Sequence, residues 1–277
     1  MKTSIRTVIT AAAIISASLI SWSCMKNDGP YYDMSIYYPN AVVTVKPLDD
    51  KGSSFYMQLD DNTTLKPLNI TASPYKEKEV RAFVNYRVIE DGDAGDYDQA
   101  VNIIWIDSLR TKTMAPDLGD RNETEYGSDP VEIIKGFPTV VEDGYMTLGF
   151  VTYTSGYGAR HDVNLIYTGD PDAAEDSEKY VVEFRHDAHG DNYGNLAEGY
   201  VAFRLDEIEG EDGITAGLPD TEGKTVKLTL KWNSIRNGAR SVQFDYCTRK
   251  SSGEIEGAGE ADGSTDGIDT ASLLKLD

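Results

Sequence analysis

The sequence has little cysteine. Only Cys24 and Cys247 occur among its 277 residues. If Cys24 is acylated, as argued below, Cys247 has no partner within the chain. Small exported domains with a weak core are usually held together by several disulfides, and this sequence cannot build such a framework. The fold must therefore be held together by a hydrophobic core.

Positive charge is also scarce. The chain has 26 Lys and Arg against 47 Asp and Glu, a net charge of −21. Affinity for nucleic acid comes largely from cationic side chains that displace counterions from phosphates, so nucleic acid is not an expected partner. An anionic membrane surface would also repel the chain. The acids are spread along the sequence and predict a solvated, soluble surface.

Long apolar runs are missing as well. An uncharged apolar run covers residues 8–20, whereas a membrane-spanning helix needs about 20 apolar residues. Lys2 and Arg6 precede the run, and no polar face interrupts it. A short basic region followed by such a run is typical of a signal peptide, which we assign to residues 1–23. Its removal takes away both cations and changes the net charge from −21 to −23.

The end of this leader resembles the lipobox of bacterial lipoproteins, because small Ser23 directly precedes Cys24. Lipoboxes usually carry Leu three residues before the cysteine, where this chain has Ser21. An ordinary secretory signal is the alternative, since Ser21-Trp22-Ser23 is also a small-x-small cleavage site. We predict that Cys24 is acylated, which anchors a protein stably when two or more chains insert. Residues 24–40, with Gly29 and two prolines, would form a tether.

The remaining sequence has the periodicity of β-strands. In residues 226–232, Val and Leu alternate with Lys and Thr and end at Trp232, and residues 242–246 place Val242, Phe244 and Tyr246 on one face. Strict alternation marks strands with one buried face. Asn237-Gly238 is a strong hairpin signal. Residues 97–109 could form a strand or a short helix, and their β-branched residues favour a strand.

The strands fall into two groups, so we predict an all-β protein. Residues 41–113 contain long strands joined by turns, which suit a small barrel. A polar stretch, residues 113–130, marks the domain boundary, and seven short antiparallel strands within 114–250 suit a β-sandwich. Residues 251–277 hold seven acids, one Lys and five Gly, and form an acidic tail in which "TASLLKL" could add a last strand.

Several blocks resemble the NigD-like lipoproteins of Bacteroidales. They are "FYMQLDDNTTLKP", "VRAFVNY" and "DGYMTLGF…HDVNLIY…VVEFRHDAHGD", in that order after the lipoprotein signal. The resemblance implies an N-terminal OB-type barrel, a C-terminal β-sandwich and attachment to the outer membrane. It implies no catalytic residues. The residues after Cys24 lack an acidic run, which favours the periplasmic face over the cell surface.

"HDAHGD" is the segment most suggestive of a site. His186, Asp187, His189 and Asp191 could offer N and O ligands to Zn²⁺, with His161 elsewhere in the same domain. The pair lacks the i, i+4 helical spacing of common zinc hydrolases. His186 instead continues the strand face of Val182 and Phe184, with residues 187–195 as a polar hairpin loop. We therefore predict no metal or other cofactor, and keep His186, His189 and Asp191 as candidate binding residues.

Other motifs give weaker indications of a functional site. "DGDAGD" (91–96) fails the EF-hand pattern, since Gly95 stands at the fifth position and Asn102 at the twelfth. No Gly-x-Ser-x-Gly motif occurs. Cys247 has no nearby His in the sequence, so an inert thiol is expected. A hydrolase with paired carboxylates stays open, because the separation of two acids depends on the fold.

Tyrosines offer the best indication of binding. Tyr153 and Tyr157 lie on or beside one predicted hairpin, where their rings could stack on sugars or anchor a protein partner. The alternative is that Tyr simply suits half-buried strand positions. We predict a non-enzymatic, lipid-anchored interaction protein whose partner is an envelope protein or a glycan. A carbohydrate-binding lipoprotein and the hydrolase are the alternatives.

Overall fold

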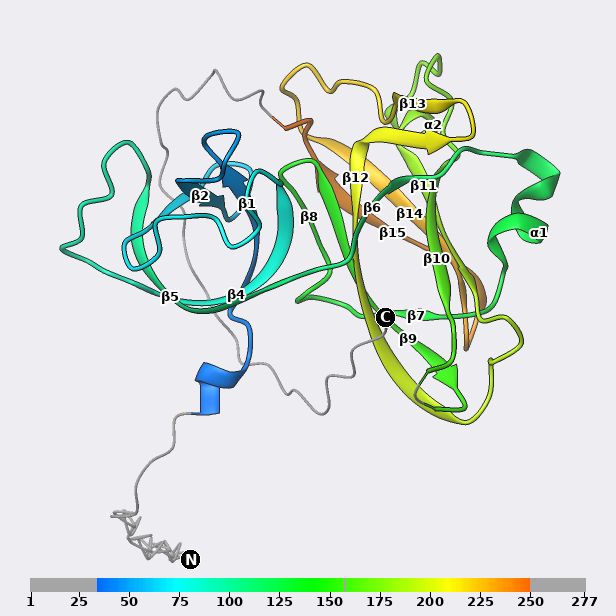
Figure 1. The fold of residues 1–277 in the computed structure, drawn as a ribbon. Helices are drawn as coiled ribbons and strands as arrows, with labels where there is room; N and C mark the ends of the chain where they lie inside the picture. The colour runs from blue at the N-terminus through cyan, green and yellow to red at the C-terminus, as the bar shows by residue number, and fades with distance from the viewer. Residues whose placement is uncertain (1–33, 157, 250–277) are drawn as a thin grey trace, which may run out of the picture. The chain divides into compact units, whose positions relative to one another are not determined.

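The computed structural model describes residues 34–156 and 158–249. Cys24, Tyr157 and the tail at 251–277 lie outside the described residues. The described chain is all-β, with a barrel followed by a sandwich, which confirms the predicted fold class (Figure 1). Within these residues, no helix has the length and apolar character needed to cross a bilayer.

Five strands close the barrel in the order β1-β2-β3-β5-β4. Residues 97–109 form a strand rather than a helix, as their β-branched side chains predict. The barrel is filled by aliphatic side chains such as Val43, Leu65 and Val84, each fully buried. The elements up to the end of the barrel are η1 (Met34–Tyr37), β1 (Ala41–Pro47), β2 (Phe55–Gln58), β3 (Thr64–Pro67), β4 (Val80–Val88) and β5 (Gln99–Ser108).

The last part of the predicted tether lies on the barrel. Asn85 Nδ2 on β4 donates hydrogen bonds to the carbonyls of Ser35 and Tyr38, at 2.9 and 2.6 Å. Trp105 Nε1 on β5 donates to the carbonyl of Ile36 at 2.6 Å. The backbone of residues 35–38 is therefore fixed to two barrel strands. We call this set of three hydrogen bonds the N-terminal clamp.

Two sheets form the sandwich. One has the order β10-β11-β14-β15, and the other has the order β13-β12-β9-β7, with β6 paired to β12 and β8 to β9. Its elements are β6 (Thr111–Met114), η2 (Gly119–Arg121), α1 (Asn122–Tyr126), β7 (Glu132–Ile133), β8 (Val140–Glu142), β9 (Tyr145–Thr154), β10 (Asp162–Tyr167), α2 (Asp176–Lys179), β11 (Val181–Asp187), β12 (Asn195–Gly210), β13 (Gly213–Ala216), β14 (Val226–Ser234) and β15 (Gly238–Tyr246).

All seven strands predicted for the sandwich are present, and most pairings are antiparallel. Two are not: β11 pairs in parallel with β14, and β6 in parallel with β12. Only residues 109–110 separate β5 from β6, and the polar stretch 113–130 contains the end of β6, η2 and α1. β6 could not be predicted from the sequence. Only Met114 of its four residues is buried, so the apolar and polar residues do not alternate along it.

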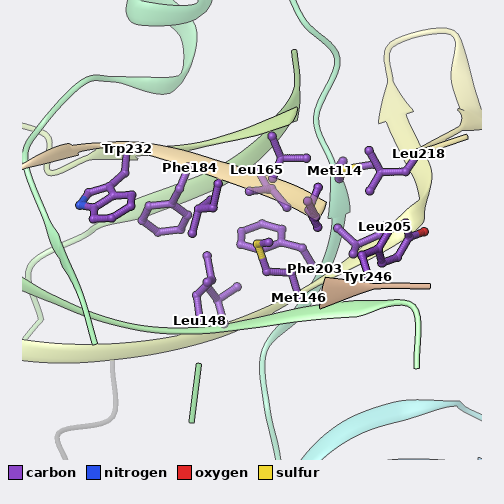
Figure 2. Packing of buried hydrophobic residues seen from close by; sticks show 14 of the residues in the cluster. Met114, Met146, Leu148, Leu165, Phe184, Phe203, Leu205, Leu218, Trp232 and Tyr246 are labelled. Atoms are coloured by element: carbon purple, nitrogen blue, oxygen red, sulfur yellow. The ribbon is translucent and has the colours of Figure 1, made fainter. Parts of the chain in front are cut away.

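The sandwich core follows the predicted alternation closely in its central strands. On β14, Val226, Leu228, Leu230 and Trp232 are buried, while Lys227 and Lys231 are exposed. Figure 2 shows that Trp232 and Phe184 lie at one end of the core, with Phe203, Met146 and Leu148 beside them and Tyr246 at the other end.

The predicted buried face of β15 holds at Tyr246 and in part at Phe244, but it is wrong at Val242. Tyr246 is buried and Phe244 is partly buried, but Val242 is 36% exposed and the six residues from Gly238 to Gln243 are all exposed. The physical reason is position, since β15 is the outermost strand of its sheet among the described residues.

The predicted hairpin loop at residues 187–195 is also corrected. β11 pairs with β10 and β14, whereas β12 pairs with β9, so this connection crosses from one sheet to the other. The connection between β9 and β10, residues 155–161, crosses in the same way. A local turn signal cannot distinguish a hairpin from such a crossing, because both need the same polar residues.

A buried arginine joins the barrel to the sandwich. Arg81 on β4 has no exposed surface. Its Nη1 donates to Thr44 Oγ1 of the barrel at 3.0 Å and its Nε to Thr147 Oγ1 of the sandwich at 3.4 Å. Its Nη2 lies 3.9 Å from Glu142 Oε2. Removing a charge from water is costly, so this guanidinium depends on contacts from both modules.

The ring of Tyr145 lies at the centre of the same junction. Arg81, Arg204 and Arg249 have their guanidinium carbons 5.6, 6.0 and 5.9 Å from its centroid, within cation–π range. Its hydroxyl donates to Glu79 Oε1 of the barrel at 2.6 Å, and Arg249 also contacts Glu79. Tyr145 is only 1% exposed, so these contacts form away from bulk water.

The turn between β8 and β9 completes this barrel–sandwich junction. Asp143 and Gly144 have φ of 51° and 72°, the positive values that a two-residue hairpin turn of this type requires. Asp143 Oδ1 pairs with Lys46 of β1 at 2.6 Å, and its backbone N–H donates to Asp61 Oδ1 at 2.7 Å. A Cβ on Gly144 would lie 3.0 Å from Arg249, so glycine also allows that side chain to pack here. The turn thus docks into the barrel.

We predict that Tyr145→Phe lowers the free energy of unfolding by about 1.5–3 kcal/mol, the usual value of a hydrogen bond to a charged group. The matched control is Tyr167→Phe, because within the described residues the Tyr167 hydroxyl is buried without a hydrogen-bond partner. Its loss should be neutral or slightly stabilising. Urea unfolding of both variants checks this, and equal destabilisation would contradict the role given to Tyr145.

Candidate functional site

The two crossing connections meet at one end of the sandwich. Residues 155–161 and 188–194 are held together there by a group that we call the histidine cluster. The cluster consists of Thr154, Ser155, His161, His186 and Asp191. It brings together one end of β9, the start of β10, the end of β11 and the loop that follows β11.

Asp191 is the acceptor at the centre of the histidine cluster. Its Oδ2 accepts hydrogen bonds from Thr154 Oγ1 at 2.7 Å and from His161 Nε2 at 3.2 Å. Both carboxylate oxygens also lie within 3.1 Å of the Ser155 backbone nitrogen. Donors that favour the ionised carboxylate, first Ser155 and then Thr154, hold the pKa of Asp191 well below its usual range.

His161 and His186 share a hydrogen bond. His161 Nδ1 lies 2.9 Å from His186 Nε2, and the ring planes are 9° from parallel with centroids 5.1 Å apart. Two imidazoles with so short an N–N distance at that centroid separation meet edge to edge in nearly one plane. Because Asp191 only accepts, His161 Nε2 carries a proton. One further proton is shared between Nδ1 and Nε2.

Burial sets the charge of the inner histidine. His186 is 1% exposed, and desolvation, followed by the charge of His161, lowers its pKa from 6.5 to about 4. His186 is therefore neutral at pH 7. The ring of His161 faces the Asp191 carboxylate. The ring of His186 packs beside Phe150, with ring centroids 6.2 Å apart. Charge is thus confined to the outer part of the cluster.

Asp129 adds a third segment to this end of the sandwich. Its backbone N–H donates to the carbonyl of His186 at 2.9 Å. Its carboxylate accepts from the Ala188 N–H at 2.8 Å and from Asn192 Nδ2 at 3.2 Å. The polar stretch that precedes β7 is thereby attached to the loop after β11.

His189 belongs to a different group. Its Nε2 lies 2.8 Å from Asp162 Oδ2 and its Nδ1 3.4 Å from Asp187 Oδ2, while Arg160 also pairs with Asp162. Its φ of 49° is rare for a residue with a side chain, and it turns the loop. The two histidines of "HDAHGD" therefore bind separate partners.

Gly194 allows the two loops to approach closely. Its φ is 98°, and a Cβ at this position would lie 2.5 Å from the carbonyl oxygen of Thr154. Any side chain here would push the end of β9, which carries Thr154, away from the loop that carries Asp191. This glycine therefore has a steric role in forming the histidine cluster.

The tyrosine candidates lie close by. Tyr153 on β9 is half-buried and stands opposite Leu196 of β12 in the sheet register. Leu196 is 57% exposed, and Tyr193 in the loop before β12 is 62% exposed. Tyr157 lies outside the described residues. Tyr153, Tyr193 and Leu196 form an exposed apolar set, which we call the aromatic edge.

The histidine cluster can hold and relay a proton. Within the described residues, no three His, Cys, Asp or Glu side chains are arranged to hold a metal ion. Cys247 is partly buried, and its sulfur lies 3.6 Å from Thr221 Oγ1 and the same distance from the Thr248 carbonyl. No described contact joins this thiol to a histidine.

Carboxylates converge elsewhere, at the barrel–sandwich junction. Burial is the first cause that raises the pKa of Glu142 to about 7, and nearby Asp60 and Asp61 add to it, while Arg81 acts against it. Such a shift suits a general acid. The neighbouring acids are already engaged, however, since Asp143 pairs with Lys46 and Asp61 accepts a backbone N–H. These contacts serve the junction.

Sequence spacing gave no indication of the central members of the histidine cluster. His161 lies 25 residues from His186, and Thr154 lies 37 residues from Asp191. Their meeting depends on two connections that cross from one sheet to the other. The only local indication was that all three histidines fall within the sandwich.

We predict that stability falls as the pH drops from 6.5 towards 4. The folded state holds His186 neutral, whereas the unfolded chain binds its proton near pH 6.5, so the contribution is complete above 6.5 and lost through pH 4. A shift of this size corresponds to about 3 kcal/mol. His186→Gln should flatten this part of the curve measured by urea unfolding. His189→Gln, the control, should leave it unchanged, and an unaltered slope in His186→Gln would refute the assignment.

The chain matches two family models. Residues 42–109 match the NigD-like N-terminal OB domain, and residues 113–246 match the NigD-like C-terminal β-sandwich domain. No curated protein matches the chain. These two matches cover the barrel and the sandwich described above.

Solved structures are also similar. A protein of Parabacteroides distasonis described only as toxin-related is 31% identical, with a TM-score of 0.56 over 75% of this chain and 92% of that one. A Bacteroides vulgatus protein of unknown function is 20% identical, with a TM-score of 0.55 over 79% and 94%. A NigD-like immunity protein of Bacteroides caccae is 20% identical, with a TM-score of 0.49 over 75% and 96%.

The two family matches lie in the order that the resemblance of the sequence blocks implies. The chain belongs to the NigD-like family, with an N-terminal OB domain and a C-terminal β-sandwich domain.

Proposed function

We propose that this protein is a non-catalytic binding protein, held by lipid on Cys24 at the periplasmic face of the outer membrane, and that its partner is another envelope protein. The observation that carries the proposal is the N-terminal clamp. Asn85 and Trp105 fix the backbone of residues 35–38 to the barrel, so the described chain is held at a defined place on the folded body from Ser35, 11 residues after Cys24.

The clamp limits how far the protein can stand from its anchor. The segment between Cys24 and Ser35 spans at most about 40 Å even when fully extended, at roughly 3.3–3.6 Å per residue. Acylation of the cysteine would therefore keep the barrel near the membrane surface. The negative charge of the chain opposes adsorption of the rest of the protein to anionic lipid.

The use of polar groups in the described structure supports binding rather than catalysis. Asp191 and His161 tie two loops together, and Glu79 and Asp143 tie the barrel to the sandwich. These ionisable groups orient neighbouring segments. A rigid two-module body of this kind offers a stable surface for a partner, because little ordering is needed when the partner binds.

We predict that Cys24→Ser moves the protein from the membrane fraction to the soluble fraction of cells, because no acyl chain can be attached. Cys247→Ser is the matched control and should leave the protein with the membrane. Fractionation with intact-mass analysis measures both the location and the mass added by acyl chains. A wild-type chain that retains residues 1–23, or begins with an unmodified residue, would contradict the proposal.

Carbohydrate binding is the second candidate function, and the aromatic edge is the observation that favours it. Tyr153 faces Leu196 across two strands, and Tyr193 and Leu196 are more than half exposed. Sugars present flat apolar faces that stack on such rings. The first residue of β12, Asn195, is exposed beside this set, and its amide could contact hydroxyl groups.

For this second candidate, Tyr193→Ala should weaken glycan binding about tenfold or more, as loss of an interface anchor does. Tyr37→Ala is the matched control, since Tyr37 is 66% exposed but lies beside the barrel. A glycan array with wild-type protein followed by calorimetry on the best ligand provides the measurement. An array without signal, or equal losses in both variants, would exclude the aromatic edge as a sugar site.

A further inference from the structure

One hairpin has a charge opposite to that of the chain as a whole. Residues 223–244, which include β14 and most of β15, contain five cations and no acid, in a chain with 47 acids. All five side chains belong to exposed residues. We call them the cationic strip: Lys224, Lys227, Lys231, Arg236 and Arg240. Lys224 pairs with Glu222 and Lys227 with Asp245, whereas no acid among the described residues forms an ion pair with Lys231, Arg236 or Arg240.

The outer strand of this hairpin offers a regular edge. β15 pairs with β14 over nine consecutive residues without a register shift, and no described strand pairs with its other side. β8 approaches β15 without pairing with it. The strand contains no Pro, and its only charged residues are Arg240 and Asp245, so little protects this edge from further pairing. Its outward backbone N–H and C=O groups are thus placed to receive another strand.

The inner face of β15 is also incompletely covered. Arg240, Val242 and Phe244 share the face that on β14 is buried. Val242 is nevertheless 36% exposed, and Phe244 is only partly buried. An added strand beside β15 would extend this sheet and cover apolar surface that is now in contact with water.

The chain itself contains a segment with matching chemistry. Residues 251–277 hold seven acids and one Lys, and residues 273–276 read Leu-Leu-Lys-Leu. The segment follows Arg249, which contacts Glu79 and Asp206 just beyond the end of β15. A chain that turns back after Arg249 runs antiparallel to β15, as in a hairpin. Covalent attachment gives the segment an effective concentration in the millimolar range.

We propose that residues 251–277 bind along the free edge of β15, with their acids on the cationic strip. Charge complementarity selects this occupant, since the strip is the one acid-free run of cations on a described hairpin and the segment is strongly acidic. The contact occupies an edge that would otherwise be open to pairing with other chains.

Amide hydrogen exchange across residues 238–246 of the full-length chain tests the proposal. The outward amides of β15 should be protected. A tail variant, with Glu254→Gln, Glu256→Gln, Glu260→Gln and Asp262→Asn, should exchange these amides at least about tenfold faster, because local protection reports the free energy of local opening. The amides that face β14 should not change and provide an internal control.

Two further variants test whether the protection of the β15 amides depends on the charges of the cationic strip. A strip variant, with Lys231→Gln, Arg236→Gln and Arg240→Gln, should reproduce the tail variant, and added salt should do the same to the wild type. A control variant neutralises four exposed acids in other loops, with Glu90→Gln, Asp91→Asn, Asp96→Asn and Glu211→Gln. It should leave β15 unaffected. Circular dichroism confirms that each variant is folded.

A direct contact should also be detected chemically. Carbodiimide joins a lysine amine to a touching carboxylate with loss of water, so Lys231 should be linked to acids within 254–262, while Lys227 is expected to link to Asp245 in any case. Outward β15 amides that exchange as fast as those of the exposed 211–213 turn would overturn the proposal. Acceleration in the strip variant without acceleration in the tail variant would also overturn it, because another acidic group would then be the occupant.

Discussion

The charged junction around Arg81 determines how this chain works as one body. A guanidinium with no exposed surface is tolerable only because the barrel supplies Thr44 and the sandwich supplies Thr147 and Glu142. Separating the modules would leave this charge on the barrel with only Thr44 of these three partners. The barrel and the sandwich are therefore energetically dependent on each other, beyond their covalent link.

Tyr145 explains why so many charges can gather at this junction. Its ring offers a negative face to three guanidinium groups, and its hydroxyl binds Glu79, which Arg249 also contacts. The cations are thus separated by an aromatic ring and neutralised by acids at the periphery. The result is a polar core between two apolar cores, and its directional contacts set the register of one module on the other.

The sequence was a good guide to the strands because their alternation reflects burial. The pattern on β14 predicted its inner face residue by residue, and β-branched residues such as Val101, Ile103 and Ile106 identified β5 as a strand. Alternation did not predict burial where a strand lacks a neighbouring strand or packs few residues on the core. β15 alternates like a buried strand but stands at an edge, and β6 lacks alternation because only Met114 meets the core.

The candidate site could be only partly anticipated for a topological reason. "HDAHGD" was noticed as a local cluster, yet His186 and His189 bind different partners, and the ring that completes the first group, His161, comes from another strand. Two connections that cross between sheets bring these residues together. Such crossings leave no periodic pattern in a sequence, since they depend on which strands pair far along the chain.

The pairing of β6 has a mechanical consequence. Leu109 and Arg110, the two residues between the modules, are both held by backbone hydrogen bonds, to Arg81 and Ala202. A force that pulls residues 35–38 away from the sandwich would pass through the barrel wall into the β6–β12 pair, because Leu109 and Arg110 leave no slack between the two modules. Parallel strands pulled along their length resist in shear, so the hydrogen bonds of the pair must break together rather than one by one. The barrel and the sandwich therefore resist being drawn apart along β6.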